Sequence, residues 1–169
     1  AAMRVESICV VPMSAMGNAI SSYTAQNIGA EQKDRVSEGY RAVTIMVLGF
    51  AAVICLALEL SGDSLAYLFL GADGTPAAMQ TAVNCMMFMG WFYCLIGFKM
   101  TADGVLRGAG DMKLFTVANL VNLGIRVLVA VTMAPRFGIF MVWAAVPVGW
   151  TANWLISYCR YRTGKWKKR

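Results

Sequence analysis

The chain has 169 residues, of which 59% are hydrophobic and 14% are charged. An ordinary soluble domain carries about 45–50% apolar and about 25% charged residues. A chain this short still exposes much of its surface, so the apolar excess cannot be hidden in a soluble core. The composition therefore excludes an ordinary soluble domain and predicts an integral membrane protein, with the lipid bilayer as its solvent.

The net charge of +6 is concentrated near the C-terminal end, where six of the fifteen Lys and Arg residues fall in 160–169. A basic tail can bind nucleic acid. Beside an apolar span, however, such a tail more often marks the cytoplasmic side of a membrane. We therefore expect a basic cytoplasmic tail at 160–169 and no nucleic-acid partner.

The residues that usually build metal sites and nucleophilic centres are scarce. The chain has no histidine, and each of its five cysteines stands alone in an apolar stretch. Zinc sites and Cys/His nucleophiles need these residues in clusters, whereas isolated thiols in apolar surroundings act as small hydrophobic side chains. We expect no metal site, no cofactor and no catalytic residue, and hence no enzyme.

Five stretches are long enough to cross a membrane, which takes about 20 mainly apolar residues in a helix. The predicted spans are 5–28, 43–60, 77–98, 114–134 and 138–158. The Ser-Gly-Asp sequence at 61–63 is expected to separate the second span from a short apolar piece, 65–70, that lies at the interface. A tight turn is expected at 135–138. The expected fold class is all-α integral membrane, with about five transmembrane helices.

Positive charges in the connections predict the orientation of these spans, because cytoplasmic loops carry an excess of Lys and Arg. With five alternating spans, twelve positive residues fall on one side and two on the other, and Arg126 lies within a span. The twelve are the six of the tail together with Lys33, Arg35, Arg41, Lys99, Arg107 and Lys113, and the two are Arg4 and Arg136. The C-terminus is therefore predicted to be cytoplasmic.

A polar stripe marks the first span. Ser7, Ser14, Asn18 and Ser21 are seven, four and three residues apart, which places them along one face of a helix. Such a face must meet protein or water at membrane depth. It is either a packing surface of small residues or the wall of a polar cavity, in which Asn18 is a candidate for contact with substrate.

The fourth span carries a second polar set, Asn119, Asn122 and Arg126, spaced three and four residues apart. An arginine within the membrane costs roughly 2.5–3.5 kcal/mol on insertion scales, so this face is expected to look into the bundle or a cavity. Two interpretations stay open. The set is either a structural network, with the long arginine reaching toward the surface, or it contributes to gating or transport.

Further candidates lie in the other spans and at their ends. Asn84, four residues from Gln80 in the third span, is a candidate for the cavity. Glu6 is expected to be shallow on the external side, and a buried carboxylate there could bind a coupling proton. Arg107 and Asp111 are four residues apart and could pair across a helical turn, and Asp111 could cap the next helix. The residues interpreted as shaping connections or gates are Gln26, Asn27, Arg107 and Asp111.

Several sequence elements together resemble the multidrug and toxic compound extrusion (MATE) family. Residues 24–30 read Thr-Ala-Gln-Asn-Ile-Gly-Ala and resemble the end of that family's eighth helix, which residues 4–6 (Arg-Val-Glu) also fit. Residues 106–111 read Leu-Arg-Gly-Ala-Gly-Asp and, with the polar set of the fourth span, resemble the connection between the tenth and eleventh helices. The elements follow the family's order over the whole chain, and the two longer ones are fairly specific in combination.

The resemblance implies a protein of twelve helices in two six-helix lobes, in which this chain corresponds to helices eight to twelve, most of the C-terminal lobe. It implies an antiporter of the plasma membrane that expels cationic or amphipathic compounds in exchange for H+ or Na+ by alternating access. Its partner would be the N-terminal lobe of the same polypeptide. Some members place a cation-binding acidic residue in the tenth helix, whereas 77–98 contains no Asp or Glu, so the coupling ion is left open.

Three other functions compete with this one. A lipid-linked saccharide flippase of the same broader superfamily would need a basic cavity for its phosphates, and the single deep arginine, Arg126, disfavours it. A membrane enzyme would need clustered carboxylates, histidines or a nucleophile, and the chain has no histidine. A noncatalytic scaffold is disfavoured by the polar residues at membrane depth.

Overall fold

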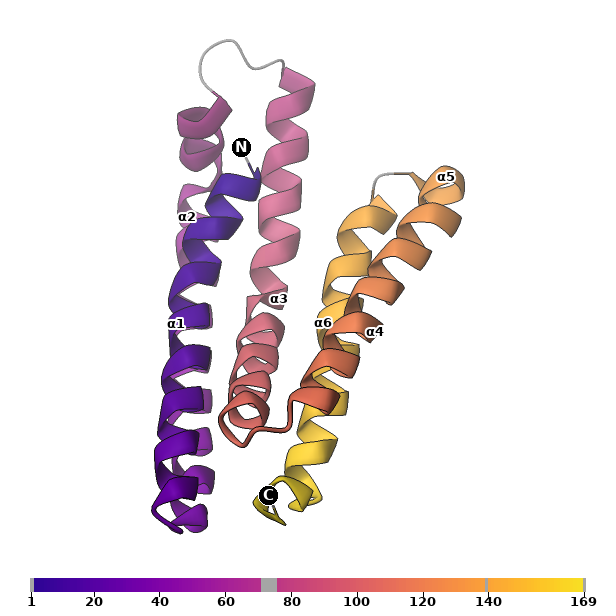
Figure 1. Cartoon of the computed structure of the whole chain (residues 1–169). Coiled ribbons are helices and arrows are strands. Elements are labelled where there is room, and N and C mark those ends of the chain that lie inside the picture. The colour runs from indigo at the N-terminus through magenta and orange to yellow at the C-terminus, as the bar shows by residue number, and fades with distance from the viewer. Residues whose placement is uncertain (1, 71–75, 139, 169) are drawn as a thin grey trace.

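The computed structural model of the chain describes residues 2–70, 76–138 and 140–168, where the regular structure is entirely helical (Figure 1). Side chains are described except at 2–6, 8, 62, 63, 65–70, 76, 78, 167 and 168. The helices are α1 (Ala2–Gly29), α2 (Lys33–Leu70), α3 (Pro76–Gly108), α4 (Met112–Thr132), the short α5 (Ala134–Phe137), α6 (Phe140–Arg162) and the 3-10 helix η1 (Lys165–Lys168).

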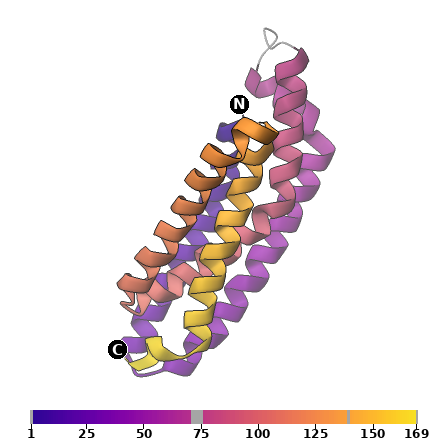
Figure 2. The same ribbon diagram turned by 90° about the vertical axis from the view of Figure 1, so that its right-hand side faces the viewer.

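The long helices run up and down along one another, with α3 at the centre (Figures 1 and 2). Helix α3 packs against α1, α2 and α6, whereas α4 packs mainly against α6. The helices therefore form two groups, α1–α3 and α4–α6, which meet through α3 and α6. The expected fold class, an all-α membrane protein, is confirmed.

The ends of the bundle differ in charge. The α1–α2 connection, the α3–α4 connection and the C-terminus lie at one end, and α5 lies at the other (Figure 1). Lys33 and Arg35 open α2 and Lys113 opens α4 at the first of these ends, while Arg136 lies in α5. The up-and-down order thus gathers the positive residues at one end, as the charge count requires.

Among the described residues, three helices combine the length and apolarity needed to cross a membrane, namely Lys33–Ser61 of α2, Met79–Gly108 of α3, and α4 as a whole. Helices α1 and α6 have 28 and 23 residues, which exceeds the about 20 residues that a span requires. Five spans with the expected boundaries stay a prediction.

The helix break expected at 61–63 is wrong. Helix α2 continues through 61–63 to Leu70, so 65–70 is no separate piece. One glycine costs a helix only about 1 kcal/mol, and no proline interrupts this one. Helix α3 continues past Phe98, the expected end of the third span, to Gly108, and the end of the span within this helix stays a prediction. The turn expected at 135–138 forms the short helix α5, with a proline in its first turn and Gly138 at φ 81°.

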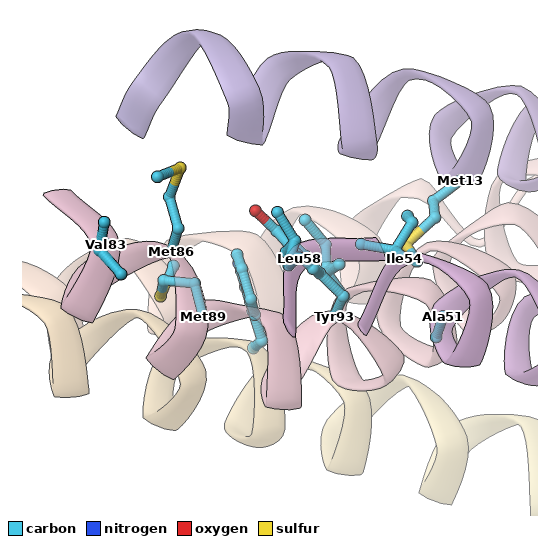
Figure 3. Packing of buried hydrophobic residues seen from close by; sticks show 10 residues of the cluster. Met13, Ala51, Ile54, Leu58, Val83, Met86, Met89 and Tyr93 are labelled. Carbon is cyan, nitrogen blue, oxygen red and sulfur yellow. The ribbon is translucent and has the colours of Figure 1, made fainter. Parts of the chain in front are cut away.

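Apolar side chains fill the space between the first three helices. Met13 of α1, Ile54 and Leu58 of α2, and Met86 and Tyr93 of α3 are at least 93% buried and form one cluster (Figure 3). Flexible methionines suit such an irregular gap because their side chains adapt to the neighbouring helices.

The outward faces are apolar as well. On α4, the side chains exposed over its length include Leu120, Leu123, Val127, Leu128 and Val131. A soluble monomer rarely exposes so large an apolar patch, whereas hydrocarbon accepts it without cost. The distribution of apolar residues therefore fits a bundle surrounded by lipid or by further membrane helices.

Glycines bring α1 and α3 into close contact. A β-carbon on Gly104 would collide with the carbonyl oxygen of Gly17, and one on Gly108 would collide with that of Ser21. A β-carbon on Gly17 would lie 2.9 Å from the carbonyl oxygen of Met100. Small residues four apart, as at 104 and 108, are the usual means by which membrane helices approach backbone to backbone.

Replacing Gly104 by alanine is expected to force α1 and α3 apart, because the obstructing atom belongs to the backbone and cannot rotate away. Overpacking of this kind costs about 1–3 kcal/mol, so the melting temperature of the purified protein in detergent should fall. Gly124→Ala is the matched control, since no atom lies within 4 Å of a β-carbon there. Equal melting temperatures for the two variants would contradict the close contact.

Candidate functional site

A buried ion pair lies inside the bundle on α3. Lys99 Nζ lies 2.9 Å from Asp103 Oδ2, and the two side chains are 12% and 5% exposed. Their spacing of four residues places both on one face of the helix. The pair lies within the stretch of α3 that is apolar and long enough to span a membrane, where ionisable residues are rare and mark functional sites by default.

Hydrogen bonds join this pair to two other helices. Ser157 of α6 donates to Asp103 Oδ1 at 2.6 Å. Asn119 of α4 accepts from Lys99 Nζ at 3.0 Å and donates to Asp103 Oδ2 at 3.4 Å. Both oxygens of the carboxylate are therefore engaged, and the ion pair holds α3, α4 and α6 together.

Asn153 extends this polar group along α6. It is fully buried, and its Oδ1 lies 3.5 Å from Ser157 Oγ. Its Nδ2 has no hydrogen-bond partner among the residues that the structure describes. A buried amide donor left unpaired costs about 1–3 kcal/mol, so this site favours a water molecule or a rearrangement that satisfies it.

A small polar cleft opens beside the ion pair, between α1, α3 and α4. It has a volume of about 170 Å³ and is lined by Ser14, Lys99, Met100, Asp103, Arg107, Phe115 and Asn119. Pockets for drug-sized molecules measure roughly 300–1,000 Å³. The cleft alone therefore suits water, an ion or a single charged group, and not a whole drug molecule.

Arg107 closes one side of this cleft and ties α3 to α1. Its Nη2 donates to Asn18 Oδ1 at 2.9 Å and to the carbonyl oxygen of Gly17 at 3.4 Å. Its guanidinium carbon lies 5.6 Å from the centre of the Phe115 ring on α4. Of the predicted polar stripe, Ser14 lines the cleft, and Asn18 is an exposed residue that accepts from Arg107, while Gly17 supplies the close packing. Whether the stripe is a packing surface or a cavity wall stays a prediction.

Asp111 has a different partner from the one its spacing suggests. Its carboxylate is 2% exposed and Oδ2 accepts from Arg160 Nε on α6 at 2.6 Å. It stands at the N-cap position of α4, yet its side chain makes no capping hydrogen bond. The expected helix cap is wrong. In place of the expected Arg107–Asp111 pair, Asp111 binds Arg160 and Arg107 binds Asn18.

Aromatic rings continue this attachment of the C-terminal segment. Trp166 is 1% exposed, and its ring stacks on that of Tyr161 with centroids 5.9 Å apart. Tyr161 in turn stacks on Tyr40 of α2 at 4.4 Å. The basic segment therefore packs on α2 through its aromatic residues, next to the ion pair of Arg160.

The rest of the polar set on α4 points elsewhere. Asn122 is partly buried against Gly149 of α6, and its Oδ1 has no hydrogen-bond partner within the described structure. The stem of Arg126 passes along the same glycine, and its side chain is exposed. Arg126 therefore lies on the exposed side of α4, outside the polar network around Asp103, and the expectation that its face looks into the bundle or a cavity stays a prediction.

The remaining candidates are spread over the molecule. Asn84 is exposed and accepts from Gln80 Nε2 at 3.0 Å. Asn27 is buried, with its Nδ2 donating to the carbonyl oxygen of Tyr23 at 2.8 Å, whereas Gln26 is exposed. Glu6 belongs to α1, and its side chain lies outside the described part. The roles expected for these residues stay predictions.

Lys99 and Asp103 are not among the site residues that the sequence predicts, because both follow Phe98, the expected end of the third span. A lysine and an aspartate four residues apart neutralise each other, which lets a helix carry both into the membrane. No proline lies between 98 and 108, so the spacing itself was the signal that the helix continues. Ser157 has no such signal, because its partner lies 54 residues away.

The long apolar helices and the ion pair buried between them define a multi-pass membrane protein. Comparison with known sequences gives the family: the MatE family model matches residues 1–132, and the chain belongs to this family. The expected resemblance is thereby confirmed.

Curated relatives from Bacillus subtilis (strain 168) match nearly the whole chain. The probable multidrug resistance protein YpnP is 29% identical over 99% of this chain and 37% of its own length. The probable multidrug resistance protein YoeA is 25% identical over 98% of this chain and 36% of its own length. The chain thus spans little more than a third of these relatives. No solved structure matches it.

Breaking the ion pair from either side should destabilise the bundle. Removing one partner of a buried pair costs about 3–5 kcal/mol because the other charge is left uncompensated. Lys99→Met and Asp103→Asn are each expected to lower the melting temperature in detergent, and the double variant should recover part of the loss. The control is the double variant Gln80→Ala with Asn84→Ala, an exposed pair with the same spacing on the same helix. If the losses of the two single variants at 99 and 103 simply added in the double variant, the two side chains would not be coupled.

Arg160→Gln should loosen the C-terminal segment, because the buried carboxylate of Asp111 loses the cation beside it. We expect faster amide hydrogen exchange at 158–168 and a lower melting temperature. Arg162→Gln is the matched control, since Arg162 is exposed and lies two residues further along the same helix. Unchanged exchange in the first variant would show that the aromatic contacts alone hold this segment.

Proposed function

We propose that this chain forms most of the second lobe of a secondary active transporter, which expels cationic or amphipathic compounds in exchange for H+ or Na+. The first lobe, on the same polypeptide, is its partner. The transporter lies in the plasma membrane with the C-terminus in the cytoplasm. Membership of the MatE family supports this function, and so do the two relatives named as probable multidrug resistance proteins.

The observation that carries the proposal for this lobe is the buried Lys99–Asp103 pair and its bonds to α4 and α6. Stability alone does not explain why an ion pair is buried here, because apolar residues of similar volume usually stabilise a core as well or better. Its bonds cross between helices, so they can break and re-form when one group of helices moves against another. We assign it the role of a switch during alternating access.

The cleft beside the pair fits the coupling step better than the drug. At about 170 Å³ it is below the size range of drug pockets, roughly 300–1,000 Å³. The exported compound would bind between the two lobes, near the middle of the membrane, as in other transporters built from two repeats. Asp103 would then exchange Lys99 for a proton or sodium ion while the compound occupies the space between the lobes.

The rival function, a lipid-linked saccharide flippase, gains one supporting observation. Two basic side chains, Lys99 and Arg107, line the cleft with a single carboxylate, which suits a phosphate better than the sequence suggests. The names of the relatives favour drug export. Transport of a labelled lipid-linked saccharide, with no export of cationic dyes, would favour the flippase.

Export can be tested in a host that lacks its own efflux systems. The full-length transporter should lower the accumulation of a cationic dye, and Asp103→Asn should reduce this effect by about tenfold or more, since one lost charged hydrogen bond is worth about 1.5–3 kcal/mol. Glu38→Gln is the matched control, an exposed acid changed to its amide on α2. Wild-type accumulation equal to that of an empty vector, over several dyes, would overturn the function.

The coupling ion can be identified with the same protein reconstituted in sealed vesicles. A pH gradient without sodium, or a sodium gradient at equal pH, should drive dye uptake, and the effective gradient identifies the ion. If neither gradient drives uptake, the antiport mechanism is wrong.

A further inference from the structure

The cleft beside the ion pair carries an excess positive charge. Its lining includes two cationic side chains, Lys99 and Arg107, and one carboxylate, Asp103. The carboxylate is occupied by Lys99, Asn119 and Ser157. Arg107 is therefore the cation that this group leaves uncompensated.

The hydrogen bonds of Arg107 confirm this imbalance. Its Nη2 donates to two neutral acceptors, the side-chain oxygen of Asn18 and the backbone carbonyl of Gly17. Its Nε is buried and has no hydrogen-bond partner in the described part of the chain. Within that part, no carboxylate forms an ion pair with Arg107. A guanidinium has a fixed set of donors suited to phosphate and carboxylate oxygens, so an anion is the group that satisfies it.

The position of Arg107 indicates the kind of anion. It is the second-last residue of α3, at the end of the bundle that also holds the α1–α2 connection and the C-terminus (Figure 1). Lys33, Arg35 and Lys113 open helices at the same end. Basic pockets between membrane helices on the cytoplasmic side bind the phosphates of anionic lipid head groups.

We propose that the cleft between α1, α3 and α4 binds a phosphate group through Arg107, and that an anionic lipid of the adjacent leaflet supplies it. The unused hydrogen-bonding capacity of the Arg107 guanidinium, which includes Nε–H, turns to a phosphate oxygen, and Lys99 lines the same cleft. The volume of about 170 Å³ accepts the phosphate while the acyl chains stay in the bilayer. This site depends on the membrane location of the chain and not on the export function.

The test uses the full-length transporter in phosphatidylcholine nanodiscs. Its melting temperature is measured with and without added phosphatidylglycerol, and separately with inorganic phosphate. We expect phosphatidylglycerol to raise the melting temperature. Arg107→Gln should weaken phosphatidylglycerol binding by about tenfold or more, because one charge-assisted hydrogen bond is lost. Arg35→Gln, an exposed arginine at the same end, is the matched control and should bind as the wild type does.

A second variant keeps the test valid if Arg107→Gln does not fold. Ser14→Asp places a carboxylate in the lining of the same cleft and should replace the external anion. This variant should melt higher than wild type in pure phosphatidylcholine and should no longer respond to phosphatidylglycerol.

Each outcome decides the matter. An equal response to inorganic phosphate and to phosphatidylglycerol supports a phosphate site with a soluble source, and a response to the lipid alone supports the lipid head group. If neither ligand shifts the melting temperature, or if Ser14→Asp responds as wild type does, the cleft holds only water and the inference is wrong. Equal losses in the variants at 35 and 107 would assign the effect to the basic end as a whole and also overturn it.

Discussion

The need to neutralise charge in a medium of low dielectric constant governs the interior of this bundle. Helix α3 carries a lysine and an aspartate within its membrane-length stretch, and each would be costly alone. Because they lie four residues apart, they neutralise each other within one helix, and the remaining hydrogen-bonding capacity of the carboxylate is used by α4 and α6. One ion pair therefore decides how the two groups of helices face each other.

The interfaces of α3 differ in kind on its two sides. Toward α1, glycines at 17, 104 and 108 allow contact between backbones, and such contacts have few alternative arrangements. Toward α6 and α4, the contact includes polar side chains whose bonds can be exchanged for others. A transporter with alternating access needs some interfaces that stay fixed and others that change. We expect α1–α3 to move as a unit and the contacts of Asp103 with Ser157 and Asn119 to be those that change.

Much of the architecture could be predicted without coordinates. The apolar composition predicted a membrane protein, and the elements at 24–30 and 106–111 indicated the family that the comparison confirms. Helix ends were harder to predict where polar residues interrupt an apolar stretch. The polar triplet at 61–63 contains no proline and does not stop α2. Helix α3 runs past Phe98, and the next two charges, Lys99 and Asp103, compensate each other within it.

The sequence by itself determined that helices form and which residues share a face, since both follow from the 3.6-residue period and from burial in hydrocarbon. Only the tertiary structure decided which polar groups meet. Asp111 binds Arg160, 49 residues away, and Arg107 binds Asn18, 89 residues away, although Arg107 and Asp111 are only four residues apart in the sequence. The physical reason is that helix packing sets these contacts: a buried charge takes the partner that the neighbouring helix presents, and no spacing along one helix records which helix that is.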